Sequence, residues 1–159
     1  MPGLSTTDWF AIVDTARDER LHPLVQQSSD RTCLIGGELD PALAATSPWL
    51  VRLEPGEPLT DVWRQHAPGR GFGITVQSQL STDALRRDLK RFLTARTPDG
   101  TVALFRFYDP VVLLPFLRAA SPDQARAFFR DVDTVCADGD APGTTVTITC
   151  LPDGRLAFA

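Results

Sequence analysis

The sequence predicts an α/β domain in which a mixed β-sheet is flanked by helices, with α+β as the alternative class and an antiparallel β-hairpin at the C-terminal end. Short apolar segments alternate with amphipathic helical segments over most of the chain, which is typical of layered α/β folds. The final thirty or so residues instead read as strands and turns. The chain has 159 residues, 43% of them hydrophobic, as expected for one globular unit. We expect residues 1–132 to form the α/β domain and residues 133–159 to form a β-rich extension packed on it.

The first half of the chain contains four candidate strands, which are rich in the β-branched and aromatic residues that strands favour. They cover residues 9–13, 32–35, 48–53 and 71–76. Helical spacing of apolar residues predicts helices at 18–27 and 59–66, with a single helical turn at 41–46. Pro23 falls in the first turn of the first helix, where a missing N–H is tolerated.

The clearest helix covers residues 82–95. Ser81 or Thr82 can cap it, and Asp83 suits the positive end of its dipole. After a turn at 98–100, residues 102–108 read as a buried strand that ends at Asp109–Pro110. A helix is expected at 111–120.

The C-terminal part begins with a helix at 122–129, for which Ser121 is the cap and Pro122 the first residue. Strands follow at 133–137, 144–151 and 155–159. Residues 151–155 have the composition of a hairpin turn.

Composition excludes several classes of function. The net charge of −4 argues against non-specific nucleic-acid binding, and no apolar run approaches the ~20 residues of a membrane span. The first eight residues lack the basic and apolar regions of a secretion signal, so we expect a cytoplasmic protein. The cysteines, Cys33, Cys136 and Cys150, are odd in number and widely spaced, which favours buried free thiols over a disulfide framework.

No sequence pattern points to catalysis, a cofactor or a metal. The glycines at 69–73 precede a strand instead of opening a helix, and no G-x-S-x-G, H-E-x-x-H or C-x-x-C motif occurs. We therefore expect no catalytic residue, cofactor or metal site. A small hydrolase that uses Asp14 or Asp109 with His22 remains an alternative, because ligands in α/β folds bind at the carboxyl ends of strands.

A cluster of basic residues is the better candidate for partner binding. It lies on one face of the predicted 82–95 helix and contains Arg86, Arg87, Lys90 and Arg91. Such a face can steer an acidic partner, although a solvated outer face with Asp88 diluting its charge is the alternative. Trp49, which follows Pro48 at a strand entrance, is a second candidate contact residue.

Arg106 is anomalous because a charge inside an apolar run needs a partner. Asp109 is the nearest acidic residue in sequence. We expect the two to form a structural pair that orients the strand-to-helix corner, with direct contact to a partner protein as the alternative.

The order of several segments resembles the adaptor, or effector-chaperone, family of bacterial type VI secretion. The matching segments lie at 12–16, 21–24 and 47–53, and residues 85–93 are followed by 98–100 and 105–110. The resemblance covers about residues 9–130. It marks Arg106, Tyr108, Asp109 and Pro110 as a structural signature, and family members often carry His where Asp88 stands.

The resemblance implies a non-enzymatic function. Such proteins bind a toxic effector protein in the cytoplasm, keep it soluble and help load it onto the valine-glycine repeat spike protein (VgrG). The implied partners are therefore the effector and the VgrG-type spike, with no nucleic acid and no membrane. An immunity protein that binds and inhibits a toxin is the alternative, beside the small hydrolase.

Overall fold

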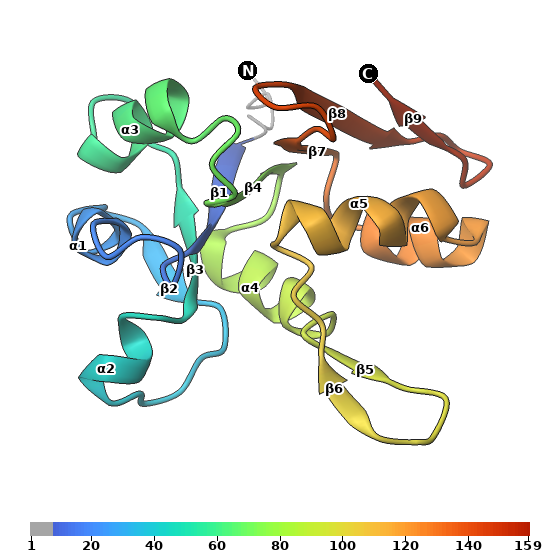
Figure 1. Cartoon of the computed structure of the whole chain (residues 1–159), viewed down its shortest axis with the longest axis horizontal. Coiled ribbons are helices and arrows are strands. Elements are labelled where there is room, and N and C mark those ends of the chain that lie inside the picture. The colour runs from blue at the N-terminus through green and yellow to red at the C-terminus, as the bar shows by residue number, and fades with distance from the viewer. Residues whose placement is uncertain (1–7) are drawn as a thin grey trace, which may run out of the picture.

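A computed structural model describes residues 8–159 of the chain. The first seven residues, on which the expectation of no secretion signal rests, lie outside the described part. The fold is a seven-stranded sheet with helices on both faces and a separate two-stranded hairpin (Figure 1). The predicted combination of a helix-flanked sheet with a C-terminal β-hairpin is confirmed.

Most elements follow the predicted order with small shifts at their ends, and the main differences lie between residues 91 and 108. The strands are β1 (Asp8–Asp14), β2 (Arg31–Cys33), β3 (Pro48–Arg52), β4 (Gly73–Ser78), β5 (Thr94–Arg96), β6 (Val102–Leu104), β7 (Thr134–Asp138), β8 (Thr145–Cys150) and β9 (Leu156–Phe158). The helices are α1 (Leu21–Gln26), α2 (Pro41–Ala44), α3 (Pro58–His66), α4 (Thr82–Lys90), α5 (Pro110–Ala119) and α6 (Pro122–Phe128).

The strand order in the large sheet is β2-β3-β1-β4-β7-β8-β9, and every pairing among these described strands is antiparallel. The parallel portion of the expected mixed sheet is thus absent from it, and the arrangement corresponds to the α+β alternative. The reason lies in β1. Strands β3 and β4 run in the same direction on either side of the α3 crossover, but β1 lies between them and pairs antiparallel with both.

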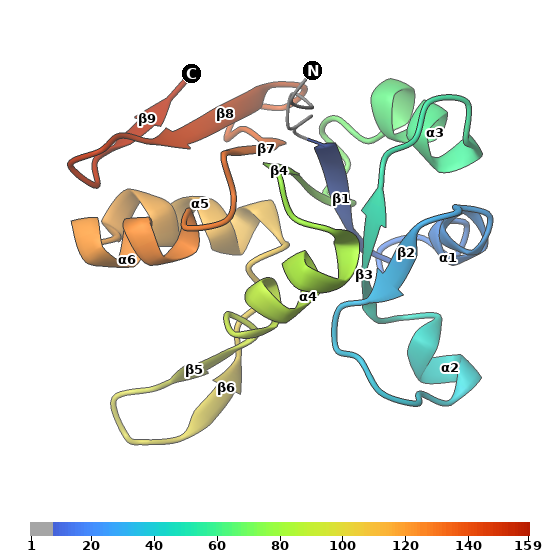
Figure 2. The ribbon, with the colours of Figure 1, turned by 180° about the vertical axis from the view of Figure 1, so that it is seen from behind.

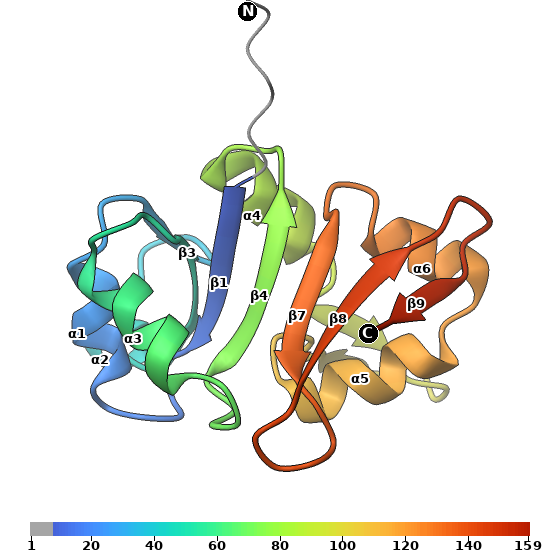
Figure 3. The same ribbon diagram turned by 90° about the horizontal axis from the view of Figure 1, so that it is seen from above.

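The central strand β1 is buried on both faces, which explains its uninterrupted apolar run. Phe10 and Ile12 join a core with α4, α5 and α6, while Ala11 and Val13 join a second core with α1 and α3. Figures 2 and 3 show these helices on opposite sides of the sheet. In Figure 3, β7, β8 and β9 are covered by helices on one face alone, so β7 alternates between buried and half-buried residues.

The prediction of a helix through residue 95 and a buried strand over 102–108 is wrong. Helix α4 ends at Lys90, and β5 and β6 form a hairpin that projects from the body (Figure 1). Its turn is closed by the backbone hydrogen bond from Thr97 N to Thr101 O (2.8 Å). Hairpin pairing satisfies the backbone hydrogen bonds of this apolar segment without burying it, and Val102 and Leu104 are 57% and 61% exposed.

The three cysteines are free, as predicted, but each is partly exposed instead of buried. Cys33 lies on the edge strand β2, and Cys136 lies on the uncovered face of β7, where packing cannot enclose it. Within residues 8–159, no helix has both the length and the apolar character needed to cross a membrane.

Candidate interaction surfaces and the signature corner

The segment between β6 and α5, residues 105–109, packs aromatic side chains into the larger core. The Phe107 side chain is fully buried, and its ring centroid lies 6.3 Å from that of Phe92 and 6.0 Å from that of Phe128. Phe105 packs edge-on against Phe116 at 5.0 Å. These contacts join the segment after α4 to α5 and α6, and ring pairs in such geometry add to the free energy gained from burial. Phe105 and Phe107, which flank Arg106 of the signature, are therefore structural.

The charged residues of the signature belong to a network that starts at the end of β1. The Arg106 Nη2 atom donates a hydrogen bond to Asp14 Oδ2 at 2.6 Å. Arg17 donates from Nε to the same Asp14 oxygen (3.2 Å) and from Nη2 to Asp109 Oδ2 (2.5 Å). Asp109 also caps α5 by accepting from the Val111 N–H. The expected Arg106–Asp109 pair is therefore wrong, because the fold brings the end of β1 between the two residues.

Burial sets the electrostatics of this network. The Asp14 side chain is 3% exposed, whereas that of Arg106 is 42% exposed and lies 5.7 Å from the Tyr108 ring centroid. Burial opposes the charged form of Arg106, but Asp14 and Tyr108 together raise the pKa of its guanidinium above the usual value. Burial is also the main cause that raises the pKa of the Tyr108 phenol. The network is thus a partly buried latch, which we call the β1–α5 latch.

The groups invoked for a small hydrolase do not meet. The His22 ring lies 5.8 Å from the Trp49 ring and within 3.2 Å of Gln26 Nε2. In the part of the chain that the structure describes, no hydrogen bond or ion pair joins His22 to Asp14 or Asp109. Both carboxylates instead accept from arginine side chains. Nor do residues 8–159 contain a group of three or more His, Cys, Asp or Glu side chains placed to hold a metal ion.

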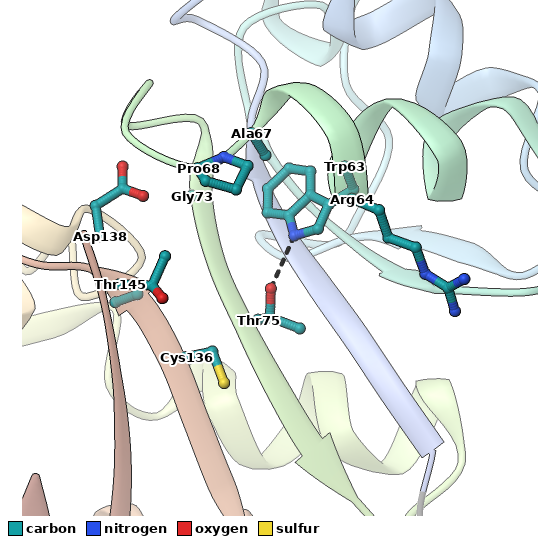
Figure 4. A pocket seen from close by; sticks show the side chains of 10 residues that line it. Trp63, Arg64, Ala67, Pro68, Gly73, Thr75, Cys136, Asp138 and Thr145 are labelled. Carbon is teal, nitrogen blue, oxygen red and sulfur yellow. Dashed lines mark hydrogen bonds between the residues drawn. The ribbon is translucent and has the colours of Figure 1, made fainter. Parts of the chain in front are cut away.

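A small hollow of about 180 Å³ lies between α3 and the uncovered face of β7 and β8 (Figure 4). Its wall is the Trp63 indole, whose Nε1 donates to Thr75 Oγ1 at 2.8 Å. Cys136 and Asp138 lie on its far side in Figure 4. The Asp138 carboxylate already accepts from two backbone N–H groups of the α3–β4 loop. Among the described residues that line this hollow, none supplies a free base next to the Cys136 thiol, as nucleophilic catalysis would need.

The predicted basic face of α4 is only partly free. Arg87 and Lys90 are exposed, and Arg86 is half-buried beside the loop that follows β2. Arg91 is instead tied back to Asp88, which also accepts from Arg130 Nη2 at 2.7 Å. Asp88 is buried on the inner side of α4, so the expectation that it dilutes the surface charge is wrong. Helical periodicity explains this, because position 88 shares a face with 85 and 89.

The cations without a partner are concentrated at this surface. Among the described residues, the basic side chains with neither an ion pair nor a hydrogen bond are Arg64, Arg70, Arg86, Arg87, Lys90 and Arg96. Four of these lie on α4 or β5, which are consecutive elements of the chain (Figure 2). We call Arg86, Arg87, Lys90 and Arg96 the α4–β5 basic surface.

Comparison with known proteins gives a family. A protein-family model described as Domain of unknown function (DUF4123) matches residues 9–127. The chain belongs to this family. No curated protein and no solved structure gave a match. The DUF4123 match covers β1 through most of α6 and contains both the β1–α5 latch and the α4–β5 basic surface.

In this DUF4123 domain the hairpin extends the basic surface with apolar side chains. Register places Val102 opposite Arg96 and Leu104 opposite Thr94, so these four side chains share one face of the hairpin. The exposed apolar pair thus lies next to one member of the basic surface.

Trp49 is placed elsewhere in the DUF4123 domain. Its indole Nε1 donates to Ala44 O (2.9 Å), and its ring packs with the core that contains α1. This core is on the face of the sheet opposite α4, so the fold does not bring Trp49 together with the basic residues predicted alongside it. Its role in partner binding stays a prediction.

Two residues of the latch were missed by sequence reasoning. Asp14 was considered only as a catalytic carboxylate, and Arg17 was not considered at all. The available signal was local: Asp14 ends an apolar strand and Arg17 follows three residues later. That spacing allows the ion pair that the structure shows, with the Arg17 side chain 40% exposed.

Proposed function

We propose that this DUF4123 protein is a cytoplasmic, non-enzymatic adaptor that binds a toxic effector of type VI secretion and helps load it onto the VgrG-type spike protein. One observation carries the proposal. Arg96 of the α4–β5 basic surface lies opposite Val102 on a projecting hairpin, where Val102 and Leu104 are more than half exposed.

Exposed apolar side chains next to unpaired charges are typical of protein-binding surfaces. An isolated two-stranded hairpin is marginally stable in water, so a partner that covers Val102 and Leu104 would stabilise it. The basic surface stands out because the chain as a whole carries a net charge of −4. It would steer an acidic region of the effector toward the hairpin.

The secretion assignment is supported by the segments that resemble type VI adaptors. The strongest of these, residues 85–93 and 105–110, fall inside the DUF4123 match. The first carries α4 with its basic residues, and the second carries the latch. Covering apolar effector surface would shift the effector away from aggregated states, because a ligand that binds the folded state stabilises it.

The test is co-expression with the toxin encoded next to this gene. We expect the toxin to become more soluble and to co-elute with the adaptor on gel filtration, and the complex to capture the neighbouring spike protein. The double variant Val102→Ser/Leu104→Ser should keep its melting temperature and lose the complex. A toxin that is equally soluble alone and never co-purifies contradicts the proposal. Protection of cells from the toxin without any capture of the spike would instead indicate an immunity protein.

A further inference from the structure

Arg70 lies between two surface hollows that are separate from the α4–β5 basic surface. It belongs to the loop that joins α3 to β4, and it lines both hollows. One has a volume of about 350 Å³ and lies between α1 and α3. The other has a volume of about 570 Å³ and lies between the start of α5 and the β7–β8 loop.

Apolar residues form part of the walls of both hollows. The walls of the smaller hollow include Leu21, Leu24, Val62 and Phe72. Those of the larger include Val111, Leu114, Pro115 and Pro142. Val111 is 79% exposed, more than any other large hydrophobic residue among residues 8–159. Apolar side chains of a partner could therefore be buried on either side of Arg70.

The carboxylates around Arg70 all have other partners. In the smaller hollow, Asp18 accepts two hydrogen bonds from the Arg20 side chain, at 2.9 and 2.6 Å. These bonds are the main cause that holds the pKa of Asp18 well below its usual range, and Arg70 adds only a smaller Coulomb contribution.

In the larger hollow the carboxylates also accept hydrogen bonds from groups other than Arg70. Asp109 pairs with Arg17, and Asp140 pairs with Arg118 through two hydrogen bonds. Asp138 accepts from the backbone N–H groups on either side of Arg70, at 2.7 and 2.9 Å. Within the described residues, the Arg70 guanidinium has no hydrogen bond or ion pair of its own. The Arg70 guanidinium is therefore free to form hydrogen bonds with a group from outside the chain.

We propose that Arg70 and these two hollows bind a protein segment in which one carboxylate side chain lies between two apolar side chains. A planar guanidinium pairs with a carboxylate through two parallel hydrogen bonds. The nearby Asp138 carboxylate is held by neutral N–H groups and keeps its negative charge, which disfavours a ligand with several negative charges. One carboxylate therefore fits this site better than a nucleic acid or a phosphate-rich surface. The inference goes beyond the proposed function, since it uses other residues and does not depend on effector loading.

The test is an NMR titration of the ¹⁵N-labelled full chain with two short peptides, acetyl-Leu-Glu-Leu-amide and acetyl-Leu-Gln-Leu-amide. We expect the Glu peptide to shift the amide signals of Gly69 and Gly71 and to bind about fivefold more tightly than the Gln peptide, as for an exposed charge pair. Arg70→Ala should abolish this difference, and Arg70→Lys should retain part of it. Arg64→Ala, which removes an exposed and unpaired arginine from α3, should leave it unchanged.

Equal affinities for the two peptides, or an undiminished preference in Arg70→Ala, would overturn the proposal. So would tighter binding of inorganic phosphate than of the Glu peptide at the same amides. Because the probes are synthetic peptides, the result is independent of the co-expression test of the adaptor function.

Discussion

Arg106 and Asp14 are 92 residues apart in the sequence, and their side chains form a 2.6 Å ion pair that fastens the end of the central strand β1 to the segment entering α5. Arg17 connects the same carboxylate to Asp109, the cap of α5. The latch therefore joins the strand that contributes to both cores to the helix that covers one of them.

Removing one member of the latch should lower stability measurably. We expect Arg106→Ala to reduce the free energy of unfolding by about 1–2 kcal/mol, because the buried Asp14 carboxylate loses one arginine but keeps the other, and because solvent screens the half-exposed guanidinium. Asp14→Ala should cost more, since both arginines lose their partner. Urea unfolding of the single and double variants would give a coupling energy of at least about 0.5 kcal/mol. An Arg106→Ala protein with unchanged unfolding and lost effector binding would instead make Arg106 a contact residue.

Charge reversal on α4 should weaken binding of the proposed effector without unfolding the domain. We expect Arg87→Glu/Lys90→Glu to raise the Kd about tenfold, through loss of attraction and added repulsion at exposed sites. The effect should shrink as salt rises toward 0.5 M, because exposed charges are then screened. Calorimetry at two salt concentrations measures both. The variant Arg64→Glu/Arg155→Glu makes the same charge change away from α4, and an equal loss there would argue against a localised surface.

Gly73 at the start of β4 should tolerate no side chain. A Cβ at this position would lie 1.8 Å from the Ile12 carbonyl oxygen, and the residue has a φ of +148°. We expect Gly73→Ala to cost about 3 kcal/mol or more, because β4 would have to separate from β1. Gly37 is the matched control: it also has positive φ but open space, so Gly37→Ala should cost only about 1–2 kcal/mol. Similar losses in thermal unfolding for the two variants would contradict this account.

The turn of the hairpin should be sensitive to acid. Asp99 accepts hydrogen bonds from the Thr97 hydroxyl and the Thr101 N–H, which lower its pKa from 3.8 to about 2. Because the folded pKa is depressed, the stabilisation is present above about pH 3.8 and is lost as the pH falls through about 2. NMR of the Asp99 carboxyl and the Thr101 amide would follow the transition. The Thr101 signal of Asp99→Asn should not titrate in this range; a pKa near 3.8 in the unmodified protein would show that the turn does not hold the carboxylate.

Local patterns in the sequence predicted most of the elements. The apolar run of β1, the caps Ser81 and Ser121, and the turn before β9 depend on neighbouring residues, and all three lie where expected. The periodicity of α4 also placed Arg87 and Lys90 on its outer side. These features are set by backbone preferences that act within a few residues.

The features that sequence reasoning missed depend on contacts between distant segments. Nothing near Arg106 in sequence identifies Asp14 as its partner, because the pair forms only when β1 is placed beside α5. Residues 102–104 have strand composition, but whether a strand joins the main sheet or a projecting hairpin depends on which other strand pairs with it. Asp88 was assigned to the surface because it is charged. Its burial is possible because Arg91 and Arg130 donate hydrogen bonds to its carboxylate and offset the cost of removing it from water.

The pairing of β7 with β4 has a consequence for any shortened version of this chain. The family match ends at residue 127, before β7, yet β7 occupies the hydrogen-bonding side of β4 that β1 leaves open. Without it, an internal strand of the sheet would become a bare, apolar template for pairing with other chains, next to an uncovered Val76 and Phe128. We therefore expect the C-terminal strands to protect β4 from pairing with other chains, and a fragment ending near residue 132 to aggregate instead of folding.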